Sequence, residues 1–235
     1  MKAKGVGMKL ENVVPWGRSL EEYIEFFMLS EDDLSKRILG CSDGPASFNS
    51  ELSKRGADVT SIDPIYKFSA QQLKNRIAEA YAEIMPQMLL NQDNYLWKSI
   101  PSVERLGQLR SGSMNTFIAD FDEGKNQGRY LEGALPNIDI VDNAYDLALC
   151  SHYLFLYSKQ LNLGLHLASL KELARVAKEV RVYPLITLKG EVSPHLSPVM
   201  ALLNVAGYST SLVDVSYEFQ KGANQMLVVK SLSDI

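Results

Sequence analysis

A chain of 235 residues, of which 46% are hydrophobic, can bury one sizeable core, and we expect a single domain over residues 1–235. The formal net charge of −4 provides no general attraction to phosphate backbones, so a nucleic-acid partner is not expected. The longest apolar run, DLALCSHYLFLY, is too short and too polar to cross a membrane, and MKAKGVGMKL lacks the apolar segment of a secretion signal. These features predict a cytoplasmic protein with no membrane partner and leave its oligomeric state open.

The chain up to residue 63 is predicted to form a helix, a strand, a second helix and a second strand, in that order. Residues 19–34 show helical spacing of aromatic side chains behind Ser19, a suitable N-cap, and residues 36–41 (KRILGC) form a short apolar strand. A helix is expected to begin at Gly44 and Pro45, before the β-branched strand at residues 57–63. Two strands joined through a helix predict a parallel pair with a right-handed crossover.

A long helical insertion follows the second strand. Apolar residues recur on one helical face from residue 69, Pro86 is expected to kink or end the first helix, and a second helix is expected at residues 103–121. A crossover needs far fewer residues than the stretch 69–125 provides. We therefore interpret this insertion as a candidate lid over a site.

The remaining pattern predicts the rest of an α/β sheet. The run at 144–151 is apolar at nearly every position, as in a central strand that is covered on both faces. The last two strands flank a turn, KGAN, and are expected to pair as an antiparallel hairpin. The expected fold is thus a Rossmann-like, doubly wound, mostly parallel seven-stranded sheet with a C-terminal antiparallel hairpin. Its later elements are strands at 129–135 and 144–151, a helix at 164–178, a strand at 179–188, a helix at 198–205, and strands at 208–220 and 225–231.

The stretch GCSDG at residues 40–44 supports two functional hypotheses. It matches the GxSxG nucleophile elbow of α/β-hydrolases, and Asp146 and His195 follow Ser42 in the correct order for a triad. However, that fold needs strands upstream of the elbow, and here only 41 residues precede Ser42. The hydrolase hypothesis is therefore the weaker of the two.

The second hypothesis is a cofactor loop. Small residues at Ser42, Gly44 and Ala46 allow the backbone to approach a ligand. Nineteen residues after Gly44, Asp63 ends the second strand, where a carboxylate can accept hydrogen bonds from both ribose hydroxyls. This arrangement indicates an adenosine-containing ligand, and the missing GxGxxG fingerprint disfavours NAD or FAD.

These stretches resemble a known superfamily. ILGCSDGPASF with GADVTSIDP, the run YDLALCSHYLFLYS and the closing hairpin resemble class I S-adenosylmethionine-dependent methyltransferases, from about Lys36 to the C-terminus without the insertion. VPWGRSLEEY, LGCSDGPASFN and VRVYPL resemble an uncharacterised bacterial branch of that superfamily. The resemblance implies S-adenosylmethionine as cofactor and a small-molecule acceptor.

The resemblance also implies roles for individual residues. Gly40 stands where an acidic residue is usual, Ser42 and Ala46 replace two glycines, and Asp43 either restores the missing negative charge or caps the turn. Asp63 would bind the ribose, while the carboxylate of the cofactor would pair with Arg18 unless Arg18 forms a surface salt bridge. The implied cofactor-binding residues are Arg18, Gly40, Cys41, Ser42, Asp43, Gly44, Asp63, Pro64, Ile65, Ala134, Leu135, Cys150 and Ser151.

Catalytic assignments are fewer, because methyl transfer needs mainly alignment of the acceptor. His152 and His195 are candidate general bases for a hydroxyl or carboxylic acid acceptor, and ordinary structural histidines are the alternative. The acidic run at 120–124 is interpreted as a solvated helix end, so no metal site is expected. The predicted function is a small-molecule methyltransferase. The alternatives are a non-catalytic adenosyl-ligand binding or interaction protein on the same fold and, less favoured, an NAD-type oxidoreductase.

Overall fold

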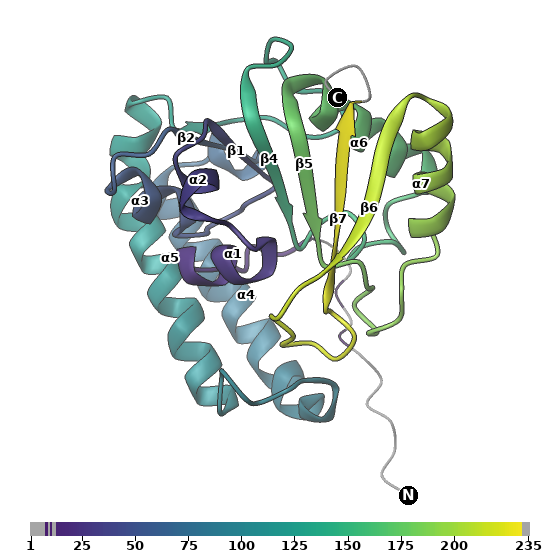
Figure 1. The fold of residues 1–235 in the computed structure, drawn as a ribbon. Helices are drawn as coiled ribbons and strands as arrows, with labels where there is room; N and C mark the ends of the chain where they lie inside the picture. The colour runs from purple at the N-terminus through teal and green to yellow at the C-terminus, as the bar shows by residue number, and fades with distance from the viewer. Residues whose placement is uncertain (1–7, 9, 11–12, 232–235) are drawn as a thin grey trace, which may run out of the picture.

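The core of the molecule is a mixed β-sheet, which the computed structural model shows within residues 8, 10 and 13–231, the part of the chain that it describes (Figure 1). Its seven strands lie in the order β3-β2-β1-β4-β5-β7-β6. Neighbours from β3 to β5 are parallel, and β7 is antiparallel to both β5 and β6. The predicted mostly parallel sheet with a closing antiparallel hairpin is therefore confirmed. The strands are β1 Ile38–Cys41, β2 Val59–Ile62, β3 Tyr130–Leu131, β4 Tyr145–Ser151, β5 Ala177–Tyr183, β6 Tyr208–Asp214 and β7 Gln225–Ser231.

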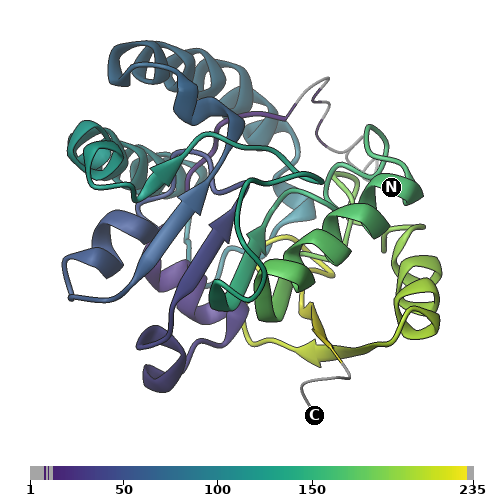
Figure 2. The ribbon, with the colours of Figure 1, turned by 90° about the horizontal axis from the view of Figure 1, so that it is seen from above.

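Helices cover both faces of the sheet, as the view from above shows (Figure 2). On one face, α1 and α3 pack against the strands, α5 lies beside α3 and β3, and α4 packs on α5. On the other face, α6 and α7 pack against β4 to β7. The helices are α1 Leu20–Phe27, α2 Glu31–Leu34, α3 Phe48–Ser53, α4 Ala70–Leu90, α5 Val103–Asn126, α6 Leu163–Val176 and α7 Leu196–Val205, with short 3₁₀ turns at Pro64–Lys67 and Gln92–Asn94.

Strand β4 lies in the middle of the sheet, between β1 and β5. Its alternate side chains belong to two separate hydrophobic clusters. Leu147 and Leu149 pack with α1 and α3, whereas Ala148 and Cys150 pack with α6 and α7. Burial on both faces explains why the strand is apolar at nearly every position. The central placement expected from the sequence is confirmed.

The helix expected at residues 19–34 is in fact two helices. Ser19 caps α1 as predicted, in a capping box with Glu22. The chain then turns through Met28, whose φ of 49° is left-handed, and Ser30 begins α2 with a second capping box. A second capping signal inside an apolar-periodic stretch therefore ended the helix early.

The insertion folds as an antiparallel helix pair, α4 and α5. Pro86 lies inside α4 and does not end it, and α5 continues to Asn126, beyond the expected limit at residue 121. No helix in the described residues is at once long enough and apolar enough to span a membrane.

The later strands are shorter than expected. Only two residues form β3, β5 ends at Tyr183, and β6 ends at Asp214. The chain between β6 and β7 instead contacts the insertion: the Leu96 amide donates to the carbonyl of Phe219 at 2.7 Å, and the Lys221 amide donates to Asn94 at 3.0 Å. These bonds take the place of the sheet pairing that the apolar pattern predicted.

Candidate active site

A cavity of about 230 Å³, called the outer pocket below, lies where the carboxyl ends of β1, β2 and β4 meet. This is the usual place for a ligand in a doubly wound sheet, because loops at the same edge converge there. Ten of the thirteen residues expected from the sequence to bind a cofactor come together in its wall. They are Arg18, Ser42, Asp43, Gly44, Asp63, Pro64, Ile65, Ala134, Leu135 and Ser151.

The loop after β1 enters the outer pocket through two left-handed residues. Ser42 has a φ of 57° and Gly44 a φ of 54°. Strained backbone of this kind at a non-glycine residue is concentrated at functional sites. The helix expected to start at Gly44 and Pro45 begins only at Phe48, because a left-handed Gly44 cannot belong to a right-handed helix. The loop is therefore longer than the sequence suggested.

Asp43 is a buried carboxylate that fills the space beside Gly40. Its Oδ1 accepts a hydrogen bond from the Tyr23 hydroxyl and its Oδ2 accepts one from the Ser61 hydroxyl, both at 2.7 Å. A Cβ at Gly40 would overlap Oδ2. Burial raises the pKa of Asp43 to about 7, although both hydrogen bonds favour the ionised form. Gly40, where the resemblance implies an acidic residue, thus has a carboxylate beside it that comes from Asp43, three residues further along the chain.

Asp63 is the second buried carboxylate of the outer pocket, at the end of β2. Oδ2 accepts from the Gly44 amide and Oδ1 from the Ile65 amide, both at 2.9 Å. Burial raises the pKa of Asp63 to about 6, and the two amides oppose this shift. Asp63 therefore ties the loop after β1 to the turn after β2, with its carboxylate at the pocket wall.

Three expected cofactor contacts lie outside the wall of the outer pocket. Gly40 and Cys41 are within β1, and Cys150 pairs in register with Cys41 from β4. The two cysteines are buried and free. Gly40 still shapes the pocket, because its missing side chain leaves room for Asp43.

The two candidate catalytic histidines are placed differently. His152 lines the outer pocket, and its Nδ1 lies 2.8 Å from the Ser151 hydroxyl. His195 caps α7, and its Nε2 lies 3.2 Å from the carbonyl oxygen of Ser158, with its ring against His166. The structure therefore brings His152, and not His195, to the pocket. Burial holds the pKa of His152 well below its usual value, with the nearby Arg18 and Arg110 acting in the same direction.

The residues of the hydrolase hypothesis do not meet. Ser42 follows Cys41, which pairs with Cys150 at the carboxyl end of β4, whereas Asp146 lies near the beginning of that strand. Asp146 instead forms ion pairs with Arg37 and Lys178. GCSDG is therefore not the elbow of a serine triad.

The segment before α1 closes one side of the outer pocket. Residues 13–16 contribute to its wall, and a Cβ at Gly17 would overlap the carbonyl of Pro45, so this segment packs directly on the loop after β1. Arg18 donates to the carbonyl of Trp16, and its Nε is buried without a partner among the described residues. Burial and the proximity of Arg110 lower the pKa of Arg18 to about 10. A buried guanidinium that forms no ion pair with a described residue favours an anion here.

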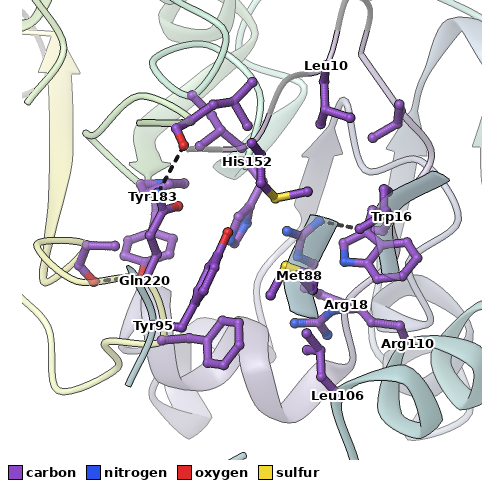
Figure 3. Close-up of a pocket in the computed structure, with 18 of the residues that line it drawn as sticks. Leu10, Trp16, Arg18, Met88, Tyr95, Leu106, Arg110, His152, Tyr183 and Gln220 are labelled. Carbon is purple, nitrogen blue, oxygen red and sulfur yellow. Dashed lines mark hydrogen bonds between the residues drawn. The ribbon is translucent and has the colours of Figure 1, made fainter. Parts of the chain in front are cut away.

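A second cavity, called the inner pocket below, adjoins the outer one. The two share Val14, Trp16, Arg18 and His152 in their walls, and Figure 3 shows Arg18 between His152 and Trp16. The inner pocket has a volume of about 80 Å³. The insertion and the loops after β4, β5 and β6 supply most of its other walls: Ile84, Met88, Tyr95, Leu106, Arg110, Tyr157, Tyr183, Tyr217 and Phe219.

Charges beside the inner pocket form a buried pair. Arg110 on α5 donates to both carboxylate oxygens of Glu22, with Nη2 to Oε1 at 2.6 Å, and Tyr217 donates to the same carboxylate at 2.9 Å. Although burial favours the protonated form, Arg110 holds the pKa of Glu22 below its usual range. With Arg18 nearby, the three groups carry a net charge of +1.

Several residues of the outer and inner pockets were not identified from the sequence. Ser61 supports Asp43 from β2, and its signal is a polar residue on the buried face of an apolar strand. Arg110 carries a comparable signal, since it is an arginine on the packed face of α5 that is 2% exposed. Val14 and Tyr153 have no distinguishing local pattern.

No protein-family model matches the chain. An uncharacterised protein of Methanocaldococcus jannaschii, MJ0045, is 30% identical over 225 residues, which are 95% of this chain and 98% of that protein. This relative is archaeal, so the restriction to a bacterial branch is not confirmed.

Several solved structures resemble the fold at low identity. Magnesium protoporphyrin IX methyltransferase from Synechocystis with bound SAM is 13% identical, with a TM-score of 0.48 over 90% of this chain and 77% of that one. The same enzyme with SAH gives a TM-score of 0.49 at 13% identity over 90% and 81%. A TehB-like SAM-dependent methyltransferase from Corynebacterium glutamicum is 14% identical, with a TM-score of 0.45 over 90% and 84%. We draw no functional conclusion from likenesses this distant.

Proposed function

The chain belongs to the family of the uncharacterised Methanocaldococcus jannaschii protein MJ0045, and we propose that it is an S-adenosylmethionine-dependent methyltransferase for a small-molecule acceptor. The observation that carries the proposal is the arrangement of the outer pocket. A carboxylate in the space at Gly40, a second carboxylate at the end of β2 and a guanidinium whose Nε has no partner among the described residues all surround one cavity at the strand ends.

These groups suit the parts of the cofactor. In our proposal Asp43 faces its ammonium group, Arg18 pairs with its carboxylate, and Asp63 accepts hydrogen bonds from its ribose hydroxyls. Ile65, with the small Ala134 and its neighbour Leu135, borders the adenine. Asp43 and Asp63 are buried with raised pKa values and form no ion pair with a described residue, so a cationic ligand would favour their ionised forms.

The remaining task of the chain is alignment. When bound, S-adenosylmethionine supplies a methyl group on a positively charged sulfur, so a lone pair of the acceptor can bond to the methyl carbon while the carbon–sulfur electron pair returns to sulfur. The pocket walls hold the two partners in line and exclude water. His152 lines the pocket and can take the proton from an acceptor hydroxyl, but the burial that lowers its pKa makes it a weaker base than an exposed histidine.

A non-catalytic adenosyl-ligand binding protein is the second candidate. The observation that favours it is the engagement of Asp63, whose two oxygens already accept from the amides of Gly44 and Ile65. Ribose hydroxyls would have to use the remaining lone pairs or displace these amides. In that case the ligand would bind weakly and no methyl transfer would follow.

Calorimetry with S-adenosylmethionine, S-adenosylhomocysteine and NAD tests the proposal. We expect both sulfur ligands to bind in the micromolar range and NAD to bind far more weakly. Asp63→Ala should weaken S-adenosylhomocysteine by about 100-fold, because hydrogen bonds to a buried charged group contribute about 1.5–3 kcal/mol each. Ser42→Ala is the matched control in the same loop and should bind normally. Absence of binding of either sulfur ligand below millimolar concentration would rule out a methyltransferase.

A further inference from the structure

The inner pocket adjoins the outer pocket. Val14, Trp16, Arg18 and His152 belong to both walls, so at this junction the two spaces are no further apart than the thickness of these side chains. A ligand in the inner pocket would therefore lie beside the methyl-bearing end of a cofactor held as proposed above. The inner pocket has the position that an acceptor site requires.

The volume of the inner pocket limits what fits. An apolar cavity of about 150 Å³ in another protein holds one benzene molecule. The inner pocket has a volume of about 80 Å³, so a single six-membered ring is the largest ring system that it can take, with part of the ring at the junction with the outer pocket. A fused two-ring system needs adjustment of the walls.

The walls favour a flat, apolar molecule. Met88 and Leu106 come from the two helices of the insertion, and Tyr95 and Tyr183 come from a loop and a strand end (Figure 3). Phe219 comes from the chain between β6 and β7. Aromatic side chains bind a ring in offset or edge-to-face contact, and a thioether adapts to its edge. Because α4 and α5 supply part of this wall, the insertion would act as a wall of the acceptor site.

The charges favour an uncharged molecule. Arg110 is already paired with Glu22, and the proposed function places the cofactor carboxylate on Arg18. The side chains of the pocket then keep no net positive charge for an ionised acceptor, and burial of an unpaired carboxylate beside Glu22 is costly. His152 offers the complementary polar contact, since no described residue hydrogen-bonds to its Nε2.

We propose that the inner pocket is the acceptor site and that it binds a neutral, single-ring aromatic molecule whose hydroxyl group lies at the junction beside His152. The proposal rests on the proposed function, because the charge of Arg18 is assigned to the cofactor. It adds the chemical class of the acceptor and a role for the helix pair.

Binding measurements on the protein saturated with S-adenosylhomocysteine test this site. The probes are phenol and 4-methylphenol as neutral single rings, benzoate as an anionic single ring and 2-naphthol as a neutral double ring. We expect the two phenols to bind at least about tenfold more tightly than benzoate and 2-naphthol, since a charge without a partner or an oversized ring each costs more than 1.4 kcal/mol. Tighter binding of benzoate, or equal binding of 2-naphthol, would overturn the assignment.

Variants locate the binding. Leu106→Trp fills the inner pocket and should abolish phenol binding, while S-adenosylhomocysteine still binds. Leu90→Trp is the matched control, because Leu90 is an exposed leucine on α4, and it should leave both ligands unaffected. Met88→Phe is a smaller change at the same cavity, available if Leu106→Trp does not fold, and should weaken phenol at least about fivefold. Phenol binding unchanged in the variant that folds would contradict the site.

The outcomes separate the two proposals. Failure of S-adenosylhomocysteine to bind the unaltered protein contradicts the methyltransferase itself. Binding of S-adenosylhomocysteine without binding of either phenol contradicts only the acceptor class.

Discussion

The outer and inner pockets share a wall, yet they are built in opposite ways. The outer pocket comes from the segment before α1 and from short stretches that directly follow β1, β2, β3 and β4, so its residues cluster in the sequence. The inner pocket collects single side chains from two helices of the insertion, three loops and the segment before α1. The first kind of site has a local pattern and the second does not, which is why the sequence predicted most residues of the outer pocket but, for the inner pocket, only an insertion that could cover a site.

The charges of the two pockets differ as well. In the outer pocket Asp43 and Asp63 are buried carboxylates with raised pKa values, and neither has a cationic partner among the described residues. Beside the inner pocket Arg110 and Glu22 neutralise each other. We infer that the outer carboxylates serve a ligand at some cost to the fold, whereas the inner pair stabilises the fold itself. The four predictions below test this difference.

Loss of the inner pair should have the largest effect. Arg110→Met leaves the Glu22 carboxylate buried without its partner, and we expect the free energy of unfolding to fall by about 3–5 kcal/mol. Chemical denaturation provides the measurement. The double variant Arg110→Met with Glu22→Gln removes both charges and should recover much of the loss. A single variant that costs less than about 1 kcal/mol would mean that the pair does not stabilise the fold.

Asp43 should have the opposite effect, and the effect should depend on pH. Its pKa is about 7 in the folded protein and 3.8 as an ordinary carboxyl group, so the folded state binds the extra proton between these values. The contribution of Asp43 to stability is therefore full below about pH 4 and is lost as the pH rises through 7. Asp43→Asn cannot ionise, so it does not lose this stability. Between pH 5 and pH 8 its free energy of unfolding should rise by about 2 kcal/mol relative to that of the unaltered protein. This gain is roughly half of the value for the whole difference in pKa, at 1.36 kcal/mol per unit.

Thermal unfolding of both proteins across this range measures the difference. Tyr23, Ser61 and Asp63 surround the carboxyl group and are unchanged in the variant. A difference in stability that does not vary with pH would show that Asp43 keeps its charge throughout. The same variant should bind S-adenosylmethionine more weakly at pH 8, because the charge that faces its ammonium group is gone.

Gly40 should tolerate no side chain, because Asp43 fills that space. Gly40→Ala forces the carboxylate away from Tyr23 and Ser61, with an expected cost of about 1.5 kcal/mol. S-adenosylhomocysteine should also bind about tenfold more weakly. Gly112→Ala is the matched control, since no atom lies within 4 Å of the added Cβ in α5, and it should be neutral or stabilising. Equal behaviour of the two variants would contradict the placement of Asp43.

Substitution of Ser42 should have the smallest effect on ligand affinity. Ser42→Ala and Ser42→Gly keep the loop in its left-handed turn, and each should change S-adenosylhomocysteine affinity less than about threefold. Titration of the two variants checks this expectation. A large loss of enzymatic activity in Ser42→Ala would instead indicate that the serine has a catalytic role.

Much of the fold could be predicted from local patterns. The seven strands, the βαβ unit and the closing hairpin follow from apolar runs and turn residues, which act over a few positions. Boundaries were less accurate where a tertiary contact competes with the pattern. β6 stops at Asp214 because the following residues bond to the insertion, and α3 starts late because Gly44 is left-handed.

The site was predictable only in part, for the same physical reason. Asp63 and Gly44 carry a recognisable spacing, but the position of Asp43 in the gap at Gly40 depends on hydrogen bonds from Tyr23 and Ser61, which are distant in the sequence. The pairing of Glu22 with Arg110 spans eighty-eight positions and has no local signal. His152 and His195 look equivalent as sequence, and only the fold separates them.

A crystal structure of the protein grown with S-adenosylhomocysteine tests the central claim most directly. We expect electron density for the ligand in the outer pocket, with the ribose at Asp63, the ammonium group at Asp43 and the carboxylate at Arg18. Density for the ligand anywhere else, or an outer pocket that stays empty at saturating concentration, would contradict the proposed cofactor site.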